Sequence, residues 1–366
     1  MTDASSLPVL ALNAGSSSLK FGLFMVGASG TRALLSGAEE SVGEPQAVLA
    51  RIVEKMNTQG LPAPGAIGHR IVHGGPHCRH HALIDAAVMG QLAAAAEFAP
   101  LHVPPALALV RAAQARFPGV AQVACLDTAF HFGMPDVART LPIPRELRAL
   151  GIERYGFHGL SGESIVRQLG SNLPPRLVIA HLGHGASVTA VAHGASVDTT
   201  MGLTPTGGVI MSTRCGDIDP GVLAYLVREE GYDAAGLESL IDQRSGMLGI
   251  SGLSGDLREL RTAAASTSSS AADARLAIAM FCASVRKQIA AMAAVLGGVD
   301  LLVFTGGIGE NDVSARAAIC EGLHGLGIPT AATRVMPPQE EEQIAWRSWQ
   351  LTQRRSTSPT AGSNIL

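Results

Sequence analysis

Short hydrophobic runs that end in polar or glycine-rich turns mark the first part of the chain. Residues 8–12 and 19–26 are two such runs, and the polar stretch 13–18 separates them, so a β-hairpin is predicted. Two buried strands and two alanine-rich helices are predicted after it: strands at residues 66–72 and 120–126, and helices at residues 85–98 and 104–117. This alternation of strands and helices indicates an α/β domain.

The second half of the chain opens with the same pattern. Residues 177–191 run from an apolar strand through a turn of glycine and histidine into a returning strand, as residues 10–24 do. Two such hairpins indicate a duplicated fold with one phosphate-sized turn in each half. Further elements are predicted downstream: helices at about 220–230, at about 272–296 and from about 312, a buried strand at 300–304, and a frayed polar tail after about 353.

Composition narrows the class of protein. The 366 residues are more than one hydrophobic core usually serves, and 47% hydrophobic against 16% charged residues excludes a disordered chain. A net charge of −3 does not resemble the basic surface of a protein that binds nucleic acid or an anionic membrane, so small-molecule partners are expected. The most apolar segment, residues 276–296, contains Arg286, Lys287 and Gln288 and therefore predicts a buried helix rather than a membrane span.

The cysteines and the N-terminal residues predict a cytoplasmic protein. The chain has five cysteines, and none of them forms a Cys-x-x-Cys pair, so neither a disulfide framework nor a zinc site is expected. The N-terminal segment has Asp3 where a secretory signal needs basic residues. Reduced thiols in a protein that is not exported fit both observations.

Two motifs of the first half are candidates for anion binding. Residues 13–20, Asn-Ala-Gly-Ser-Ser-Ser-Leu-Lys, place small hydroxyl residues and a glycine at a strand end, with Lys20 as an added charge. They do not form a Walker loop, and an ordinary serine-rich hairpin is an equal alternative. Arg70 ends a buried strand beside two histidines and two glycines, where its guanidinium could hold a carboxylate or phosphate. The alternative for Arg70 is a structural ion pair.

Three histidines that follow Arg70 are not interpreted as a metal site. His77, His80 and His81 lack the spacing of metal ligands. They are interpreted as part of a polar loop.

Asp127 and His158 are candidates for the reacting centre. Asp127 follows an apolar strand, where carboxylates that bind Mg²⁺ often lie, although a helix N-cap fits equally well. His158 lies among glycines and aromatic residues and could donate to developing negative charge. The alternative is a core histidine that its neighbours satisfy.

The second half adds an arginine and a glycine-rich loop. Arg214 is a second isolated arginine in a turn, whereas Asp219 followed by Pro220 predicts a helix start with Asp219 as its N-cap. Residues 304–311, Phe-Thr-Gly-Gly-Ile-Gly-Glu-Asn, follow a strand and precede a helix. That arrangement is typical of a glycine-lined contact with a nucleotide.

Taken together and in this order, the motifs resemble the acetate kinase family, which belongs to the fold group of actin, the sugar kinases and Hsp70. The resemblance runs from Asn13 to about Ala345 through seven separated strings: NAGSSSLK, GHRIVHGG, LDTAFH, YGFHG, HLGHGAS, the stretch from DTTMGLTP to TRCGDIDP, and FTGGIGEN. It implies an α/β protein of two duplicated ribonuclease-H-like (actin-like ATPase) domains with the active-site cleft between them. The expected domains are residues 1–148, completed by about 346–366, and residues 149–345, which would bind the nucleotide and form a homodimer.

The resemblance also implies roles for particular residues. Asn13 and Glu340 would lie near Mg²⁺, or Mn²⁺ in its place, and His158 would stabilise the transition state. Arg70 and Arg214 would hold the acetate carboxylate and the transferring phosphoryl group, with Asp127 oriented toward the metal or an arginine. The pocket for the acyl methyl group would comprise Val72, Leu101, Phe157 and Pro205. The nucleotide would contact Lys20, His181, Leu182, Gly183, His184, Gly185, Asp256, Leu257, Arg258, Gly307, Ile308, Gly309, Glu310 and Asn311.

The chemistry of this reaction agrees with such a residue set. Acetate is already ionised at neutral pH, so the nucleophile needs no strong general base. Two anions must approach in line while charge spreads over the phosphoryl oxygens, which calls for arginine, histidine and Mg²⁺. Direct transfer from ATP to the carboxylate is therefore favoured, and a proton-transfer role for Asp127 is secondary.

Two residues depart from the family pattern. His184 stands where the family usually has asparagine, and Gln339 stands where an asparagine precedes the metal-binding glutamate. The run Glu340-Glu341-Glu342 leaves the metal ligand uncertain by one position. Neither departure removes a charged catalytic residue, so nucleotide affinity is affected more than the type of reaction.

The expected activity is that of an acetate kinase, with ATP and acetate giving ADP and acetyl phosphate reversibly. Propionate is an expected further substrate, because one methylene changes discrimination by only about 1–3 kcal/mol. One alternative is a kinase mainly for propionate or butyrate. Another is a non-catalytic nucleotide-dependent clamp, against which the combination of Arg70, Arg214 and His158 argues.

Overall fold

The computed structural model describes residues 6–15, 18–40, 44–328 and 333–357. The chain divides into two compact units, of which the first comprises residues 1–129, 159–164 and 339–366 and the second residues 130–158 and 165–338. The predicted boundaries lie at 148/149 and 345/346, whereas here residues 130–148 group with the second unit and residues 339–345 with the first. His131 illustrates the first difference, because its ring bonds to Ser196 and to the Phe157 carbonyl of the second unit.

The first unit is built on a six-stranded sheet in the order β3-β2-β1-β4-β6-β5. Its strands are β1 (Leu7–Ala14), β2 (Ser18–Gly27), β3 (Gly30–Glu40), β4 (Ala66–Ile71), β5 (Ala82–Leu83) and β6 (Ala121–Leu126). The predicted hairpin is confirmed, since β1 and β2 are antiparallel, and β1, β4 and β6 run parallel to one another.

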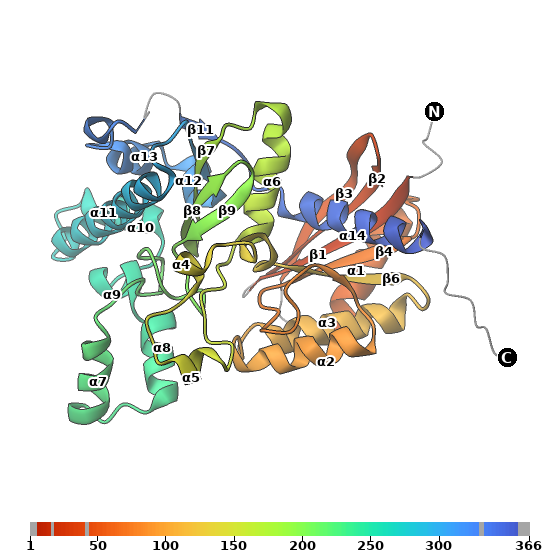
Figure 1. Ribbon diagram of the computed structural model, residues 1–366, viewed down its shortest axis with the longest axis horizontal. Coiled ribbons are helices and arrows are strands. Elements are labelled where there is room, and N and C mark those ends of the chain that lie inside the picture. The colour runs from red at the N-terminus through yellow and green to blue at the C-terminus, as the bar shows by residue number, and fades with distance from the viewer. Residues whose placement is uncertain (1–5, 16–17, 41–43, 329–332, 358–366) are drawn as a thin grey trace. The chain divides into compact units, whose positions relative to one another are not determined.

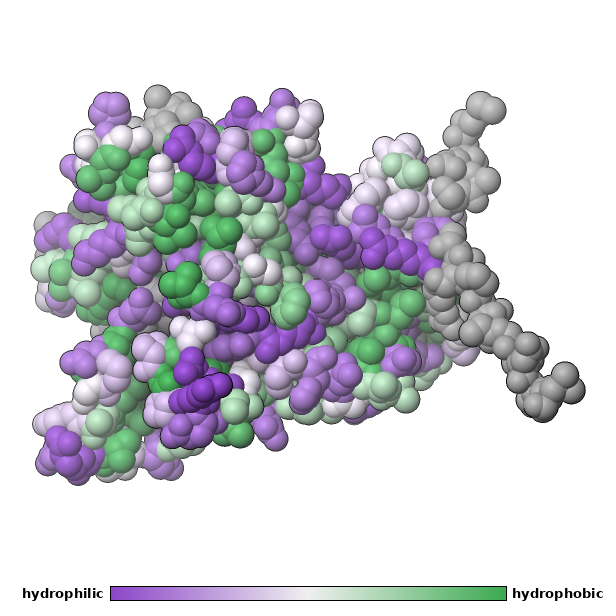
Figure 2. Space-filling view, viewed as in Figure 1, coloured by the Kyte–Doolittle hydropathy of each residue, from purple (hydrophilic) through white to green (hydrophobic). Residues whose placement is uncertain are grey.

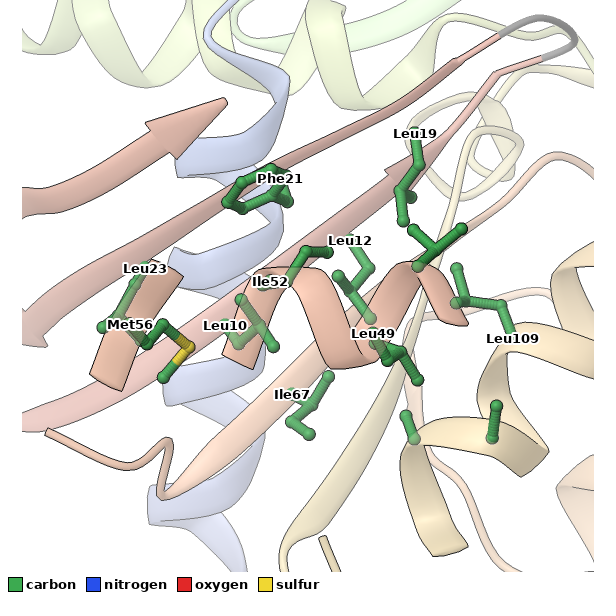
Figure 3. Packing of buried hydrophobic residues seen from close by; sticks show 13 residues of the cluster. Leu10, Leu12, Leu19, Phe21, Leu23, Leu49, Ile52, Met56, Ile67 and Leu109 are labelled. Carbon is green, nitrogen blue, oxygen red and sulfur yellow. The ribbon is translucent and has the colours of Figure 1, made fainter. Parts of the chain in front are cut away.

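Helices cover both faces of this sheet (Figure 1). They are α1 (Pro45–Thr58), α2 (Ala86–Ala94) with the 3₁₀ turn η1 (Ala95–Glu97), α3 (Val103–Arg116) and α14 (Glu340–Thr357). Because side chains alternate along a strand, Leu10 and Leu12 of β1 pack under α1 and α3, as Figure 3 shows. Val9 and Ala11 face the other way and pack with Ile344 of α14.

Gly68 of β4 allows α14 to lie close against the sheet. A side-chain carbon at Gly68 would lie 2.5 Å from Ile344 Cγ2 and 2.2 Å from Ser348 Oγ. Contacts this short are not tolerated, so the α14 position requires a glycine here. The helix continues to Thr357, beyond the fraying predicted after about 353, and residues 358–366 lie outside the described part.

The second unit is built on a five-stranded sheet in the order β11-β10-β7-β8-β9. Its strands are β7 (Arg176–Leu182), β8 (Ala186–Ala192), β9 (Ala195–Thr199), β10 (Leu301–Thr305) and β11 (Thr333–Val335). The first three strands form antiparallel pairs and β10 runs parallel to β7. The order 9-8-7-10-11 repeats the order 3-2-1-4-6 of the first unit, so the predicted duplication is confirmed.

The three helices predicted for the second unit are confirmed as α7 (Pro220–Glu229), α11 (Ala271–Leu296) and α13 (Val313–Cys320). The other helices were not predicted, and one of them, α12 (Gly306–Asn311), occupies residues that were interpreted as a glycine-rich loop. Helix α6 (Gly159–Leu169) begins with residues that belong to the first unit. Two short α-helices are α4 (Asp136–Arg139) and α5 (Arg145–Arg148), and three 3₁₀ turns are η2 (Ala129–His131), η3 (Gly170–Asn172) and η4 (His324–Leu326). The others are α8 (Ala234–Gln243), α9 (Gly246–Ser251) and α10 (Leu257–Ala264). Asp219 accepts a hydrogen bond from Gly221 N at the start of α7, which confirms the predicted N-cap.

Helix α11 is the one helix of the described residues that is long and apolar enough to cross a membrane. Its buried side chains recur at helical spacing and include Phe281, Val285 and Ile289. Arg286 donates to the carbonyl of Ile319 near the end of α13. One face of α11 is therefore packed in the core, as predicted, whereas Leu276, Met280 and Val295 on the helix are exposed.

Candidate active site

A cluster of polar side chains lies at one edge of the first sheet. Asn13 is near the end of β1, Arg70 near the end of β4, and Asp127 directly after β6. Because these three strands are parallel neighbours, their carboxyl ends meet at the same edge. Asn13 and Asp127 are buried, so their polar atoms need partners within the protein or from a ligand.

Arg70 and Asp127 form a buried ion pair. Arg70 Nε and Nη2 both donate to Asp127 Oδ2, at 2.8 and 2.6 Å, and Nη1 donates to the Ala14 carbonyl at 3.3 Å. The structural ion pair considered for Arg70 is therefore present, and Asp127 uses its carboxylate for this pair rather than as a helix cap. Three of the five N–H groups of Arg70 are engaged in these bonds.

The second carboxylate oxygen of Asp127, Oδ1, takes no part in the ion pair with Arg70. Oδ1 is buried and has no hydrogen-bond partner among the described residues. The backbone of Asp127 is fixed, since its N–H donates to Ile71 O at 3.0 Å and its carbonyl accepts from Gly159 N at 2.8 Å. A rigid buried carboxylate with one unpartnered oxygen is suited to a cation or to a donor of a ligand.

Burial and charge oppose each other in this pair. Burial raises the pKa of Asp127, and the positive charge of Arg70 counteracts only part of that effect. Burial alone would lower the pKa of Arg70, but Asp127 and then Glu340 raise it above its usual value. Arg70 therefore stays protonated, and any further cation nearby would favour the ionised form of Asp127.

Asn13 joins this cluster to the start of α14. Its Nδ2 donates to Glu340 Oε2 at 2.9 Å and to Glu341 Oε1 at 2.8 Å. The two predicted metal ligands are thus brought together, and both glutamates contact Asn13. Glu340 is the one whose charge also acts on both Arg70 and Asp127.

The donor set of this cluster fits a small divalent cation. It comprises carboxylate and amide oxygens, which Mg²⁺ prefers, and three carboxylates face one arginine. In the described part of the chain, no three acidic, histidine or cysteine side chains already converge as a complete metal site.

In the second unit, the glycine turn after β7 and the glycine-rich helix α12 after β10 lie side by side. His181 pairs with Thr305 in the sheet, and Gly183 N donates to Gly185 O at 2.9 Å in the turn that follows. Gly306 has φ 78°, and a side-chain carbon there would lie 2.7 Å from Leu182 O. The predicted nucleotide residues 181–185 and 307–311 are therefore brought together.

The third predicted nucleotide segment, residues 256–258, lies at the start of α10. Asp256 caps this helix through Arg258 N and also pairs with the exposed Arg258 side chain, while Leu257 is buried. Arg261 of α10 donates to Asp312 at 2.7 and 2.8 Å, which ties α10 to the residue after α12. Lys20 belongs to the first unit, where it is the exposed cross-strand partner of Asn13.

His158 and Arg214 converge on Gly185. A side-chain carbon at Gly185 would lie 3.1 Å from Arg214 Nη1 and 3.2 Å from His158 Nε2. His158 has φ 58°, its Nδ1 lies 3.0 Å from Ser187 Oγ, and its ring stacks on His181 with the centroids 4.1 Å apart. The absence of a side chain at Gly185 leaves a space between two potential donors, which is suited to an anion.

His184 lies beside this space and is exposed. Partial burial lowers the pKa of its imidazole, and the charge of Arg214 lowers it further. A neutral imidazole at neutral pH therefore occupies the position where the family pattern has asparagine.

The four residues predicted to form the acyl pocket differ in exposure. Val72 and Phe157 are buried, Pro205 is half-buried, and Leu101 is 61% exposed. Val72 and Leu101 belong to the first unit and Phe157 and Pro205 to the second. Their common role stays a prediction.

The position of His81 differs from the one that the sequence predicts. His81, taken as part of a polar loop, is almost fully buried and lies 3.0 Å from Glu163 Oε1. Neither its spacing nor its neighbours in the sequence indicate this, because Glu163 is distant in the chain.

The shared strand order is that of the duplicated actin-like ATPase fold, in which one unit here carries a carboxylate–arginine cluster and the other carries glycine loops. Within that class, the chain belongs to the acetokinase family, whose sequence profile matches residues 46–345. The protein is a phosphotransferase with a carboxyl group as acceptor.

Similar proteins and solved structures support the same family assignment. The chain is 43% identical over 351 residues to acetate kinase 2 of Neisseria meningitidis serogroup B, covering 87% of this chain and 86% of that protein. It is 38% identical over 374 residues to the acetate kinase of Parabacteroides distasonis, covering 92% of each. A propionate kinase from Francisella tularensis superposes with a TM-score of 0.87 at 33% identity, over 94% of this chain and all of the other (100%). Porphyromonas gingivalis acetate kinase gives a TM-score of 0.81 at 32% identity, with the same coverage of 94% and 100%.

Proposed function

We propose that this protein is an acetate kinase that transfers the γ-phosphoryl group of ATP directly to the carboxylate of acetate, giving ADP and acetyl phosphate in a reversible reaction. The observation that carries the proposal is the convergence of His158 Nε2 and Arg214 Nη1 on the space above Gly185. Preorganised donors of this kind stabilise charge that develops on phosphoryl oxygens. The curated relatives named acetate kinase support the choice of acid.

Arg70 is proposed to hold the acetate carboxylate. Its Nε and Nη2 are fixed on Asp127, and two N–H groups of the guanidinium are not used in the bonds to Asp127 and Ala14. Asp127 then serves to orient Arg70 rather than to transfer a proton, because acetate arrives already ionised.

His158 is proposed to donate to the transferring phosphoryl group from Nε2. This requires a hydrogen on Nε2, which is favoured when Nδ1 accepts a hydrogen bond from the Ser187 hydroxyl 3.0 Å away. Arg214 adds a positive charge on the other side of the same space. The turn at residues 183–185 and the first residues of α12, 306–309, are proposed to contact the phosphates of the nucleotide.

Asn13, Glu340 and the unpartnered Oδ1 of Asp127 are proposed to hold Mg²⁺, with Glu341 beside them. The bound cation would neutralise charge on the phosphate oxygens and so reduce repulsion between the two anions. Glu340 is preferred over Glu341 because its charge acts on both Arg70 and Asp127.

A second candidate is a kinase that prefers propionate. The similarity to the Francisella tularensis propionate kinase supports it, and a single methylene changes discrimination by only about 1–3 kcal/mol.

We also propose a homodimer that forms through the second unit, in the cytoplasm. Helices α7 and α8 have no buried residue, and Val222, Tyr225 and Val227 of α7 are exposed. Hydrophobic surface, green in Figure 2, is interspersed with polar surface in the region where Figure 1 labels these helices. Apolar residues gathered on such helices are typical of an interaction surface, and light scattering of the purified protein measures the oligomer directly.

The test of the proposed activity is a hydroxylamine trap of acyl phosphate. Purified protein, Mg²⁺ and ATP are incubated with acetate, propionate, butyrate or no acid. Hydroxamate from acetate above the no-acid control is expected, and the yields rank the acids. ATP binding without hydroxamate from any acid would contradict a kinase and indicate a nucleotide-dependent clamp.

A further inference from the structure

A chain of hydrogen-bonded polar side chains, with the buried carboxylate of Glu163 at its centre, connects three segments of the first unit. His81 lies just before β5, Glu163 lies in the first turns of α6, and Gln343 and Arg347 lie on α14. The side chains of His81 and Glu163 are only 9% and 7% exposed. None of these four residues belongs to the proposed catalytic or binding set.

Glu163 is the central member of this chain. It accepts hydrogen bonds from Gln343 Nε2 at 3.0 Å and Arg347 Nε at 2.8 Å, both at Oε2. His81 Nε2 lies 3.0 Å from Oε1 and 3.2 Å from Oε2. Burial alone would raise the pKa of Glu163, but His81 and Arg347 together lower it to about 2. The carboxylate is therefore ionised and fully bonded at neutral pH.

His81 connects this carboxylate to β6. Its Nδ1 accepts from Leu126 N at 2.9 Å, so Nδ1 carries the lone pair and Nε2 carries the hydrogen that is donated to Glu163. The pairing of β5 with β6 ends at Ala82 opposite Ala124. The imidazole thus supplies the acceptor for Leu126 N beyond the end of the ladder, and the next residue is Asp127.

The other side of the chain reaches the start of α14. Gln343 lies three residues after Glu340, which places the two side chains on neighbouring positions of one helix face. Glu163 is thus bonded to the turn of α14 that begins with Glu340, and through His81 it is bonded to the end of β6 that leads into Asp127.

We propose that His81 and Glu163 are positioning residues that fix the Asp127 end of β6 against the Glu340 end of α14. They hold the carboxylate- and metal-binding half of the site in its working geometry without touching either ligand. This inference rests on the proposed function, because it assigns the purpose of the geometry to that reaction.

Three substitutions of His81 separate its two bonds. His81→Leu removes both bonds. In His81→Asn, the amide oxygen can take the position of Nδ1 and accept from Leu126 N, but the side chain is too short for Glu163. In His81→Gln, the amide nitrogen can take the position of Nε2 and donate to Glu163, but no acceptor faces Leu126 N.

The expected result is a selective change in the KM for acetate, because Arg70 and Asp127 of the first unit are proposed to bind and orient this substrate. At saturating Mg²⁺, His81→Leu raises the KM for acetate about tenfold, with the KM for ATP within about twofold of the unmodified protein. His81→Asn recovers most of the acetate KM, whereas His81→Gln does not. Equal shifts in both KM values, or equal effects of asparagine and glutamine, would mean that His81 acts only on stability and would overturn the proposal.

Gln122→Leu is the matched control. Gln122 also forms a buried side-chain bond on β6, to His69 Nε2 at 2.7 Å, but at the opposite end of the strand from Asp127. It is expected to lower the melting temperature as His81→Leu does and to leave the KM for acetate within about twofold.

Metal binding gives a readout besides activity. Binding of Mn²⁺ in the presence of ADP is followed by loss of the free-ion electron paramagnetic resonance signal. Glu163→Gln is expected to weaken this binding several-fold, and unchanged binding would overturn the role of Glu163. Failure of the proposed function is a different result, in which the unmodified protein yields no hydroxamate with any acid.

Discussion

The two units share one sheet plan and carry opposite chemistry at the same edge. In the first unit, the ends of β1, β4 and β6 carry the charged or amide side chains of Asn13, Arg70 and Asp127. Arg70 bonds to Asp127, and Asn13 bonds to Glu340 of α14. In the second unit, β7 leads into a turn in which Gly185 leaves space beside His158 and Arg214, and β10 leads into the glycine-rich helix α12. The same topological positions therefore provide rigid charges in one unit and open backbone in the other.

Under the proposed function, the duplicated fold divides one reaction between its two copies. Buried charges must be paired, so in the first unit the ion pair of Arg70 and Asp127 contributes both to the proposed substrate binding and to the stability of the fold. Glycine turns need no buried charge, so the second unit can approach phosphates with its backbone. Substitutions in the first unit should affect stability and activity together, and substitutions in the glycine turns should affect activity alone.

The largest effect is expected for Arg70→Met. It leaves the buried Asp127 carboxylate without its partner, which should lower the free energy of unfolding by about 3–5 kcal/mol and reduce kcat/KM by about 10³-fold or more. Chemical denaturation and steady-state kinetics measure the two effects. The double substitution with Asp127→Leu should recover much of the stability and none of the activity, because it removes the unpaired charge but not the need for the guanidinium.

If Arg70→Met lost activity without loss of stability, the ion pair would not stabilise the fold. The proposed contrast between the two units would then be wrong.

A smaller effect, confined to activity, is expected for Gly185→Ala. The new methyl group would lie 3.1 Å from Arg214 Nη1 and 3.2 Å from His158 Nε2, so it would occupy the space proposed for the phosphoryl group. We expect kcat to fall about 10²-fold while the melting temperature stays nearly unchanged.

Gly183→Ala is the matched control in the same turn. Its methyl group would have Gly185 O as nearest neighbour at 3.5 Å, an ordinary contact distance. Equal losses in the two alanine variants would show that the turn as a whole is sensitive, rather than the space beside His158 and Arg214.

Acid should act on the first unit through Glu163. Its pKa of about 2 lies below the ordinary value of 4.5, so the ionised form stabilises the fold. This contribution, up to about 3 kcal/mol, is complete above pH 4.5 and is lost as the pH falls toward 2. Denaturation between these pH values should therefore show a steeper loss of stability for the unmodified protein than for Glu163→Gln. Parallel slopes would mean that another carboxylate dominates.

The sequence predicts the strands with the strongest hydrophobic patterns and the motifs at their ends. The hairpins, the parallel strands, α7 and α11 lie where the pattern predicts them. Hydrophobic periodicity and the glycine, proline or polar residues that end an element are local signals, so the sequence alone contains them. β3 and α1 were not predicted, since β3 is an edge strand with many exposed positions and α1 follows a short polar stretch. Burial of His81 could not be predicted either, because its partners Glu163 and Leu126 meet it only through the tertiary fold.

The site was predicted in the same uneven way. Glycines and arginines in unusual local settings made residues 70, 183–185 and 214 candidates, and the family resemblance supplied the roles that are proposed for them. The sequence did not choose between Glu340 and Glu341, and the structure explains the difficulty, because both carboxylates accept from Asn13. The contacts that form when a helix packs on a sheet cannot be predicted from the residue spacing within the helix or within a strand.

The smallest effect is expected for His184→Asn, which restores the family pattern in the second unit. The lowered pKa of His184 keeps the imidazole neutral at pH 7.5, so the exchange replaces one neutral polar group by another on an exposed side chain. We expect the KM for ATP to change by less than about threefold and kcat to stay the same. The difference should grow only as the pH falls well below 6.5, where the imidazole becomes charged beside Arg214 and the phosphates. Because the first unit does not contain this residue, the KM for acetate serves as the internal reference. A large change in the KM for ATP at pH 7.5 would mean that the imidazole itself contacts the nucleotide and that the glycine turn alone does not account for phosphate binding.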